Sequence, residues 1–125
     1  MTKLYANISV EHENNVDTIT NRIVSAAQCN VDAVIITKTT PGLVIPEEKK
    51  YVPVTTRWGT MSYVDYAKKC EITKDTFLHI TKLCEQIGIP LIWSVTDVTS
   101  AEFVKNYSKG EIVKIHANCI DAIDL

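Results

Sequence analysis

The run Ala33–Ile36 constrains the fold of this chain more than any other short segment. Its four apolar residues are consecutive rather than alternating with polar ones. This pattern is typical of a strand that is buried on both faces of a parallel sheet. Parallel neighbours need a long crossover between them, most often a helix. The run therefore predicts an α/β protein in which helices cover a parallel sheet.

Strand and helix patterns alternate along the rest of the chain, with one long interruption at about residues 39–71. The predicted strands are Leu4–Val10, Ala33–Thr37, Leu91–Val95 and Glu111–His116. The predicted helices are Val16–Gln28 after an Asn14 or Asn15 cap, a short one around Ser62–Lys69, Lys74–Ile87 between Thr73 and Gly88, and one ending at Tyr107 that a Thr99–Glu102 capping box opens. The count is about four β/α units in one domain, residues 1–125.

The composition excludes several classes of partner. A formal net charge of −2 and a sequence pI near 5.9 give no basic surface for nucleic acid or for an anionic membrane. No apolar run approaches the ~18 residues of a membrane-spanning helix, and the first residues lack the apolar core of a signal peptide. We therefore expect a soluble, cytoplasmic protein.

The four cysteines indicate packing rather than chemistry. They are widely separated and form no CxxC pair, which argues against a structural zinc site. Free cysteine at helix and strand ends behaves as a small apolar residue. We expect reduced, packed thiols at Cys29, Cys70, Cys84 and Cys119.

Four β/α units make half of an eight-stranded TIM-type barrel, which typically needs ~250 residues. A half-barrel leaves two strand edges unpaired and one apolar sheet face without a cover. We expect this chain to complete its barrel by forming an even-numbered homo-oligomer. The alternative is that the excursion at about 39–71 folds over the open side as a lid and leaves a monomeric open sheet.

The excursion also carries the strongest resemblance to a known family. The run TTPGLVIPEEKKYVPVTTRWGTMSYVDYAKK, together with the segments Tyr5–Val10, Asp32–Lys38 and Gly88–Val104, resembles the N-terminal half of the barrel of the N-acetylneuraminate (sialic acid) synthase family. The resemblance covers nearly the whole chain. It implies condensation of phosphoenolpyruvate with an amino sugar at the carboxyl ends of the strands. It also implies a divalent metal, a glutamate on the first strand and lysines that hold the phosphate and carboxylate.

Most of the implied catalytic positions are altered. Asn7 stands where the family has its glutamate, and an amide cannot act as a general acid or base near neutral pH. Ile35 replaces the phosphate-holding lysine, and Ala117 replaces a serine, whereas Lys114 is retained. Lys38 either reaches an anion in place of the missing lysine or is solvated.

Metal binding is not expected. The family's metal-binding histidines come from the later half of the barrel. His12, flanked by Glu11 and Glu13, and His116 each follow a strand, but spacing fixes no third ligand, so hydrogen-bonding histidines are the favoured interpretation. We expect no cofactor, with a divalent metal only if the chain is an enzyme. His79 is expected to face solvent.

The polar and aromatic residues near the strand ends predict a binding site for a small molecule. One interpretation is that Trp58, Tyr63 and Tyr66 anchor the excursion by burying their rings. The other is that Arg57, Trp58 and Tyr63 line a pocket. The predicted ligand-binding residues are Lys38, Arg57, Trp58, Tyr63, Ser94, Asp97, Lys114, His116 and Asn118.

Two functions of different classes follow. The favoured one is a non-catalytic, oligomeric binding protein derived from the synthase barrel that holds an anionic sugar- or nucleotide-like metabolite. By analogy, it resembles viral sponges that sequester nucleotide immune signals in the host cytoplasm. The alternative is a synthase-like enzyme that condenses phosphoenolpyruvate with an amino sugar, completed by dimerisation or by a second chain. A third, weaker hypothesis is a structural subunit with a vestigial pocket.

Overall fold

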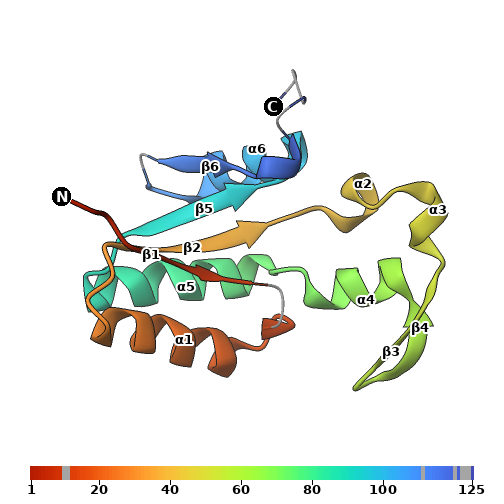
Figure 1. Cartoon of the computed structure of the whole chain (residues 1–125), viewed down its shortest axis with the longest axis horizontal. Coiled ribbons are helices and arrows are strands. Elements are labelled where there is room, and N and C mark those ends of the chain that lie inside the picture. Colours follow the sequence, from red (N-terminus) through yellow and green to blue (C-terminus); the bar gives the residue numbers. More distant parts are fainter. Residues whose placement is uncertain (10–11, 111, 120, 122–124) are drawn as a thin grey trace.

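The computed structural model of the chain describes residues 1–9, 12–110, 112–119, 121 and 125. Four parallel strands form its central sheet, with helices packed against one face (Figure 1). In spatial order the strands are β1 (Tyr5–Ile8), β2 (Ala33–Lys38), β5 (Leu91–Val95) and β6 (Val113–Ile115). The predicted parallel α/β fold is therefore confirmed. The predicted strand residues Val10 and Glu111, and Glu11 beside His12, lie outside the described residues.

Two long helices lie side by side under the sheet, and their ends match their sequence signals (Figure 1). In α1 (Val16–Gln28) the Asn15 side chain accepts a hydrogen bond from the Thr18 amide at 3.0 Å. In α5 (Lys74–Ile87) Thr73 caps the start, and Gly88 ends the helix with a positive φ of 80°. Caps of this kind satisfy backbone groups that a helix end leaves without partners.

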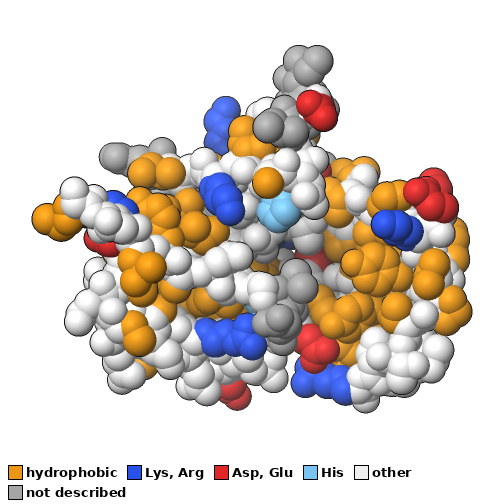
Figure 2. Space-filling view, in the orientation of Figure 1, with side chains coloured by type: hydrophobic (Ala, Val, Ile, Leu, Met, Phe, Trp, Pro, Cys, Tyr) orange, Lys and Arg blue, Asp and Glu red, His pale blue; other side chains and the backbone are white. Residues whose placement is uncertain are grey.

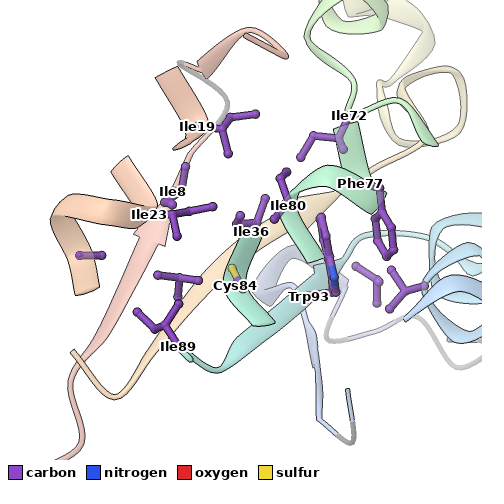
Figure 3. Packing of buried hydrophobic residues seen from close by; sticks show 14 residues of the cluster. Ile8, Ile19, Ile23, Ile36, Ile72, Phe77, Ile80, Cys84, Ile89 and Trp93 are labelled. Carbon is purple, nitrogen blue, oxygen red and sulfur yellow. The ribbon is translucent and has the colours of Figure 1, made fainter. Parts of the chain in front are cut away.

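The core lies between these helices and the sheet (Figure 3). Phe77 of α5 stacks on Trp93 of β5 with ring centroids 4.0 Å apart, and Phe103 of α6 (Val98–Tyr107) meets Phe77 edge-on at 5.0 Å. Ile36 of β2 packs in the same cluster. Even-numbered side chains of β2 therefore face the helices, since side chains alternate between the two faces of a strand.

The excursion between β2 and α5 is more ordered than the sequence indicates. It contains the short helices α2 (Pro41–Val44) and α3 (Glu47–Lys50), an antiparallel hairpin of β3 (Pro53–Thr56) and β4 (Gly59–Ser62), and helix α4 (Tyr63–Cys70). The predicted short helix is confirmed one residue later, but the hairpin was not predicted. The whole excursion lies beyond the carboxyl ends of the strands (Figure 1). Tyr5, on the sheet face away from the helices, stays exposed.

Two sequence predictions about helix and strand ends are wrong. Helix α6 begins after Asp97, whose side chain and that of Ser100 form the capping box, so Thr99 and Glu102 do not cap it. In β6 the ladder spans only Val113–Ile115, and the 3-10 turn η2 (Ala117–Cys119) follows. Among the described residues, no helix is long and apolar enough to cross a membrane.

Candidate functional site

A cleft of about 420 Å³ opens at the carboxyl ends of the strands, between the sheet and the excursion. We call it the strand-end cleft. Figure 2, in the orientation of Figure 1, shows the surface hollowed here, with hydrophobic side chains gathered beside the hollow over the excursion. Its described lining consists of Asn7, Ser9, Thr37, Thr39, Pro41, Val44, Ile45, Tyr63, Tyr66, Ala67, Cys70, Glu71, Thr96, His116 and Asn118.

The parallel ladder brings the polar groups of the sheet together. Asn7 of β1 pairs in register with Ile35 of β2, and Thr37 lies two residues further along the same face. The chain then leaves β5 at Thr96, which also reaches the cleft. These side chains share the sheet face away from α1 and α5. They also lie at the carboxyl ends of the strands, which is where ligands bind in open α/β sheets and barrels.

The opposite wall comes from α4, which begins because Ser62 accepts a hydrogen bond from the Asp65 amide at 3.2 Å. Tyr63 and Tyr66 on this helix both line the cleft. Hydrogen bonding to Cys70 and burial raise the pKa of Tyr66 to about 12, and burial raises the pKa of the Cys70 thiol. Both groups therefore remain protonated near neutral pH and act as neutral donors or acceptors.

A second, open cavity of about 700 Å³ continues from the cleft along α2 and η2. Residues that line both spaces are Val44, Ile45, Tyr63, Thr96, His116 and Asn118, and Lys49 and Asp97 line only the second. The Nδ1 atom of His116 accepts a hydrogen bond from the Asn118 amide at 3.3 Å, so the strand-end turn holds the imidazole ring in place. Together the two spaces are large enough for a small metabolite, since ligand pockets usually measure ~300–1,000 Å³.

Of the nine predicted ligand-binding residues, the structure brings Tyr63, His116 and Asn118 together in the strand-end cleft. Asp97 lines only the adjoining cavity. Its carboxylate accepts hydrogen bonds from the amides of Ser100 at 2.7 Å and Thr40 at 2.9 Å. Burial alone raises the pKa of Asp97, but these hydrogen bonds outweigh burial and lower the pKa.

The predicted cations lie elsewhere. Lys38 is only 5% exposed, so the solvated alternative is wrong. Its Nζ lies 2.5 Å from a Glu71 oxygen and 5.1 Å from the centre of the Phe103 ring, on the helix side of the sheet. Lys114 is exposed on β6, where it pairs in register with Ser94.

Ser94 is fully buried, and its hydroxyl has no hydrogen-bond partner within the described part of the chain. It lies between Thr37 and Lys114 in the sheet, on the face away from the helices. The lining of the strand-end cleft does not include it. Ser94 and Lys114 thus lie on the same face of the sheet as the cleft residues, but they do not line the cleft.

Arg57 and Trp58 form the turn of the hairpin and do not belong to the cleft lining. The Arg57 guanidinium lies over the Trp58 ring at 4.3 Å, and its Nε lies 2.9 Å from a Glu13 oxygen. The Tyr66 hydroxyl donates to the other Glu13 oxygen at 3.4 Å. Arg57 therefore ties the hairpin to the loop after β1 instead of lining the cleft. Trp58 is 40% exposed beneath the Arg57 guanidinium, so its ring neither lines the cleft nor is buried as the anchoring alternative expects, whereas Tyr63 lines the cleft.

Glu71 is the functional candidate that the sequence interpretation missed. It follows α4 directly, and its side chain lines the cleft while pairing with Lys38. The threonines of the cleft were also missed, although each lies at or just beyond the end of a predicted strand. These positions could have identified the threonines as cleft residues, because ligands bind at the carboxyl ends of parallel strands.

The donor set does not fit the divalent metal that the family resemblance implies. Among the described residues, no group of three or more histidine, cysteine, aspartate or glutamate side chains is placed to hold a metal ion. His12 is 3% exposed, and its Nδ1 accepts the Asn14 amide at 2.8 Å. Burial, with a smaller effect of Arg22, lowers the pKa of His12. The predicted exposure of His79 is confirmed.

Comparisons with known proteins agree with this geometry. Residues 22–125 match the sequence model of the NeuB family. The crystal structure of an N-acetylneuraminic acid (sialic acid) synthetase from Leptospira borgpetersenii, in complex with citrate, superimposes on 98% of this chain with a TM-score of 0.80 and 19% identity. That of a spore coat polysaccharide biosynthesis protein, SpsE, from Bacillus subtilis covers 90% with a TM-score of 0.60 and 18% identity.

The chain spans 39% of the first of these proteins and 28% of the second. Its four-stranded sheet matches an N-terminal part of a TIM barrel. No curated protein shows significant sequence similarity to the chain. The expected fold and the expected family resemblance are both confirmed.

Proposed function

Because the chain belongs to the NeuB family, we propose that it binds a small sugar-like molecule in the strand-end cleft without condensing it with phosphoenolpyruvate. The observation that carries this proposal is the pair Asn7 and Ile35. The two residues lie side by side in the ladder, on the face that leads into the cleft. The family resemblance implies a glutamate and a lysine at these positions.

Neither replacement can perform the implied chemistry. An amide exchanges no proton near neutral pH, and one positioned proton-transfer group is worth ~10²–10⁴-fold in rate. Ile35 is 9% exposed and presents no charge to a phosphate. The cleft nonetheless keeps polar side chains that can hold a ligand without converting it.

The chemistry of the lining supports a hydroxyl-rich ligand. Amide groups of Asn7 and Asn118 and the hydroxyls of the cleft threonines can both donate and accept hydrogen bonds. Tyr63 and Tyr66 add ring faces, and Val44 with its neighbours adds an apolar wall. Polar groups in a mostly apolar concavity are the usual composition of a small-molecule site. The nucleotide-like ligand predicted from the sequence has less support in the strand-end cleft itself, because no lysine or arginine side chain belongs to the described lining there, whereas Lys49 lines the adjoining cavity.

We also propose that the protein functions as an even-numbered homo-oligomer. Ile112, Val113 and Ile115 are exposed on or beside β6, and Tyr5 is exposed on β1. Exposed apolar side chains along an unpaired strand edge favour association. Native mass spectrometry of the purified chain tests this proposal, and a monomer at micromolar concentration would contradict it.

Two assays on the same preparation test the function. Saturation-transfer NMR with a panel of hexoses and N-acetylhexosamines should detect binding, which Asn118→Ala should weaken. Incubation with phosphoenolpyruvate, N-acetylhexosamines and Mn²⁺ or Mg²⁺ should release no phosphate. Metal-dependent phosphate release would overturn the non-catalytic proposal in favour of the synthase alternative. The absence of any sugar binding would overturn the binding proposal.

A further inference from the structure

Within the part of the chain that the structure describes, one side chain gives the lining of the strand-end cleft its formal charge. Of the aspartate, glutamate, lysine and arginine side chains that the structure describes, only Glu71 belongs to the cleft lining. Its carboxylate is 31% exposed. The remaining described polar lining consists of amides, hydroxyls, a thiol and the His116 imidazole.

Lys38 balances this carboxylate from behind. The two atoms of the ion pair, Lys38 Nζ and Glu71 Oε1, lie 2.5 Å apart, and Lys38 Nζ also donates to the Thr39 carbonyl at 3.2 Å. Lys38 is buried between the sheet and the ring of Phe103, and it lines a separate cavity of about 290 Å³. Glu71 lines both cavities. The ion pair is therefore part of the wall between the two cavities, and its anionic end faces the cleft.

A ligand in the cleft meets the carboxylate before it meets the ammonium group. A ligand hydroxyl can donate to a carboxylate oxygen, and hydrogen bonds to charged groups are stronger than neutral ones. A ligand carboxylate or phosphate instead faces a like charge, which specific sites use to reject wrong partners. We propose that Glu71 is the specificity-determining residue of the cleft, which selects uncharged, hydroxyl-rich ligands and excludes anionic ones.

This inference rests on the proposed sugar-binding function and deepens it. It replaces the anionic ligand expected from the sequence with a neutral one. Lys38 is not a ligand-binding cation in this arrangement. Lys38 is the buried partner and Glu71 compensates its charge, since a buried charge is stable only when it is paired, and the ion pair holds the Glu71 carboxylate in place.

The test compares matched probes on the full chain. Each pair is a neutral hexose and its uronic acid, namely glucose and glucuronate, galactose and galacturonate, and mannose and mannuronate, with the hexose 6-phosphates added. Dissociation constants come from titration by saturation-transfer NMR. For the unmodified chain we expect the neutral member of a binding pair to be preferred by about tenfold or more.

Substitutions on the two sides of the ion pair should act in opposite directions. Glu71→Gln leaves Lys38 uncompensated and should reduce the preference for the neutral probe by about tenfold. Lys38→Met leaves the carboxylate uncompensated and should strengthen the preference. The double variant Lys38→Met with Glu71→Gln removes both charges and should lie between the two. It also keeps the test valid if an unpaired Lys38 unfolds the protein.

Glu85→Gln is the matched control, because it makes the same change of charge on α5 in a separate groove next to Pro90. It should leave every preference unchanged. Equal or tighter binding of the anionic probes to the unmodified chain overturns the inference but not sugar binding. Shifts of the same sign in both single variants also overturn it, since a purely structural role of the pair predicts them. If no probe binds, the proposed function fails and the inference fails with it.

Discussion

Removing the Asp97 carboxylate should destabilise the fold strongly, because this one side chain joins the β5–α6 connection to the end of β2 through three hydrogen bonds. It accepts hydrogen bonds from the Ser100 amide at the start of α6, from the Thr40 amide after β2 and from the Thr96 hydroxyl after β5. The donor distances are 2.7, 2.9 and 3.1 Å. Asp97→Ala leaves all three donors without this partner.

The magnitude follows from these contacts. Loss of an N-cap side chain costs about 1 kcal/mol. The Thr40 amide donates to a charged acceptor, and such a bond contributes roughly 1.5–3 kcal/mol. With water partly replacing the carboxylate at this half-buried site, we expect Asp97→Ala to lower the free energy of unfolding by about 3 kcal/mol. Asp97→Asn retains an acceptor oxygen and should cost about 1 kcal/mol.

Urea unfolding followed by circular dichroism measures these losses. With a slope of about 2 kcal/mol per molar urea, the Asp97→Ala midpoint should fall by about 1.5 M. Thr99→Ala is the discriminating control, because the sequence alone predicts that Thr99 caps α6. It should change stability by less than about 0.5 kcal/mol. A Thr99→Ala loss equal to that of Asp97→Ala would refute the role given to Asp97.

The pH dependence provides an independent check. Hydrogen bonding lowers the pKa of Asp97 in the folded protein below its ordinary value of 3.8. The unfolded chain therefore binds this proton more readily, so the stabilisation is present above pH 3.8 and is lost as the pH falls through the folded value. The stability difference between the unmodified chain and Asp97→Asn should narrow below pH 3.8. A difference that stays constant there would contradict the ionic character of the cap.

Three further predictions concern the core and its titratable groups. Burial lowers the pKa of His12, so the unfolding free energy should fall as the pH drops below 6.5. His12→Gln should reduce this slope. Burial raises the pKa of Cys84 to about 11, so iodoacetamide at pH 8 should label exposed Cys29 first and Cys84 only after unfolding. Equal labelling rates would contradict this. Phe77→Ala should cost about 3–5 kcal/mol in urea unfolding, and a loss under 2 would mean that its aromatic stack is unimportant.

The long helices were predictable because local and tertiary signals agree in them. In α5 the apolar residues recur at helical spacing, Thr73 precedes the first turn, and Gly88 follows the last. Each signal has a separate physical cause, and all of them indicate the same boundaries. The buried strands β2 and β5 could be predicted equally well, since a strand inside the sheet keeps their runs of apolar residues away from water.

The hairpin was not predictable from its own sequence. Its strands contribute one half-buried apolar pair, Val54 opposite Met61, so period-two alternation is too short to be recognised. Its turn is anchored from outside by Glu13, which belongs to the loop after β1. Contacts between distant segments, rather than propensity, define this element.

The start of α6 shows a different kind of failure. Two overlapping patterns compete there, Thr99 with Glu102 and Asp97 with Ser100. Both provide a capping residue followed three positions later by a polar partner. The structure uses the earlier pair because β5 ends at Val95, and Thr40 supplies a second donor to Asp97. Local sequence cannot distinguish the two patterns, since the deciding donor comes from the end of another strand.

The position of Lys38, by contrast, follows from the parity of the strand. Side chains alternate between the two faces of a strand, so residues an odd number of positions apart lie on opposite faces. Ile35 faces the cleft side and Lys38, three positions later, faces the helices, where it meets Glu71. A one-residue slip of β2 would expose Ile36 and is excluded by pairing on both sides of the strand. Lys38 therefore cannot replace the lysine that the family resemblance implies at Ile35. Its ion-pair partner Glu71, which follows α4, places a carboxylate rather than a cation at the wall of the cleft.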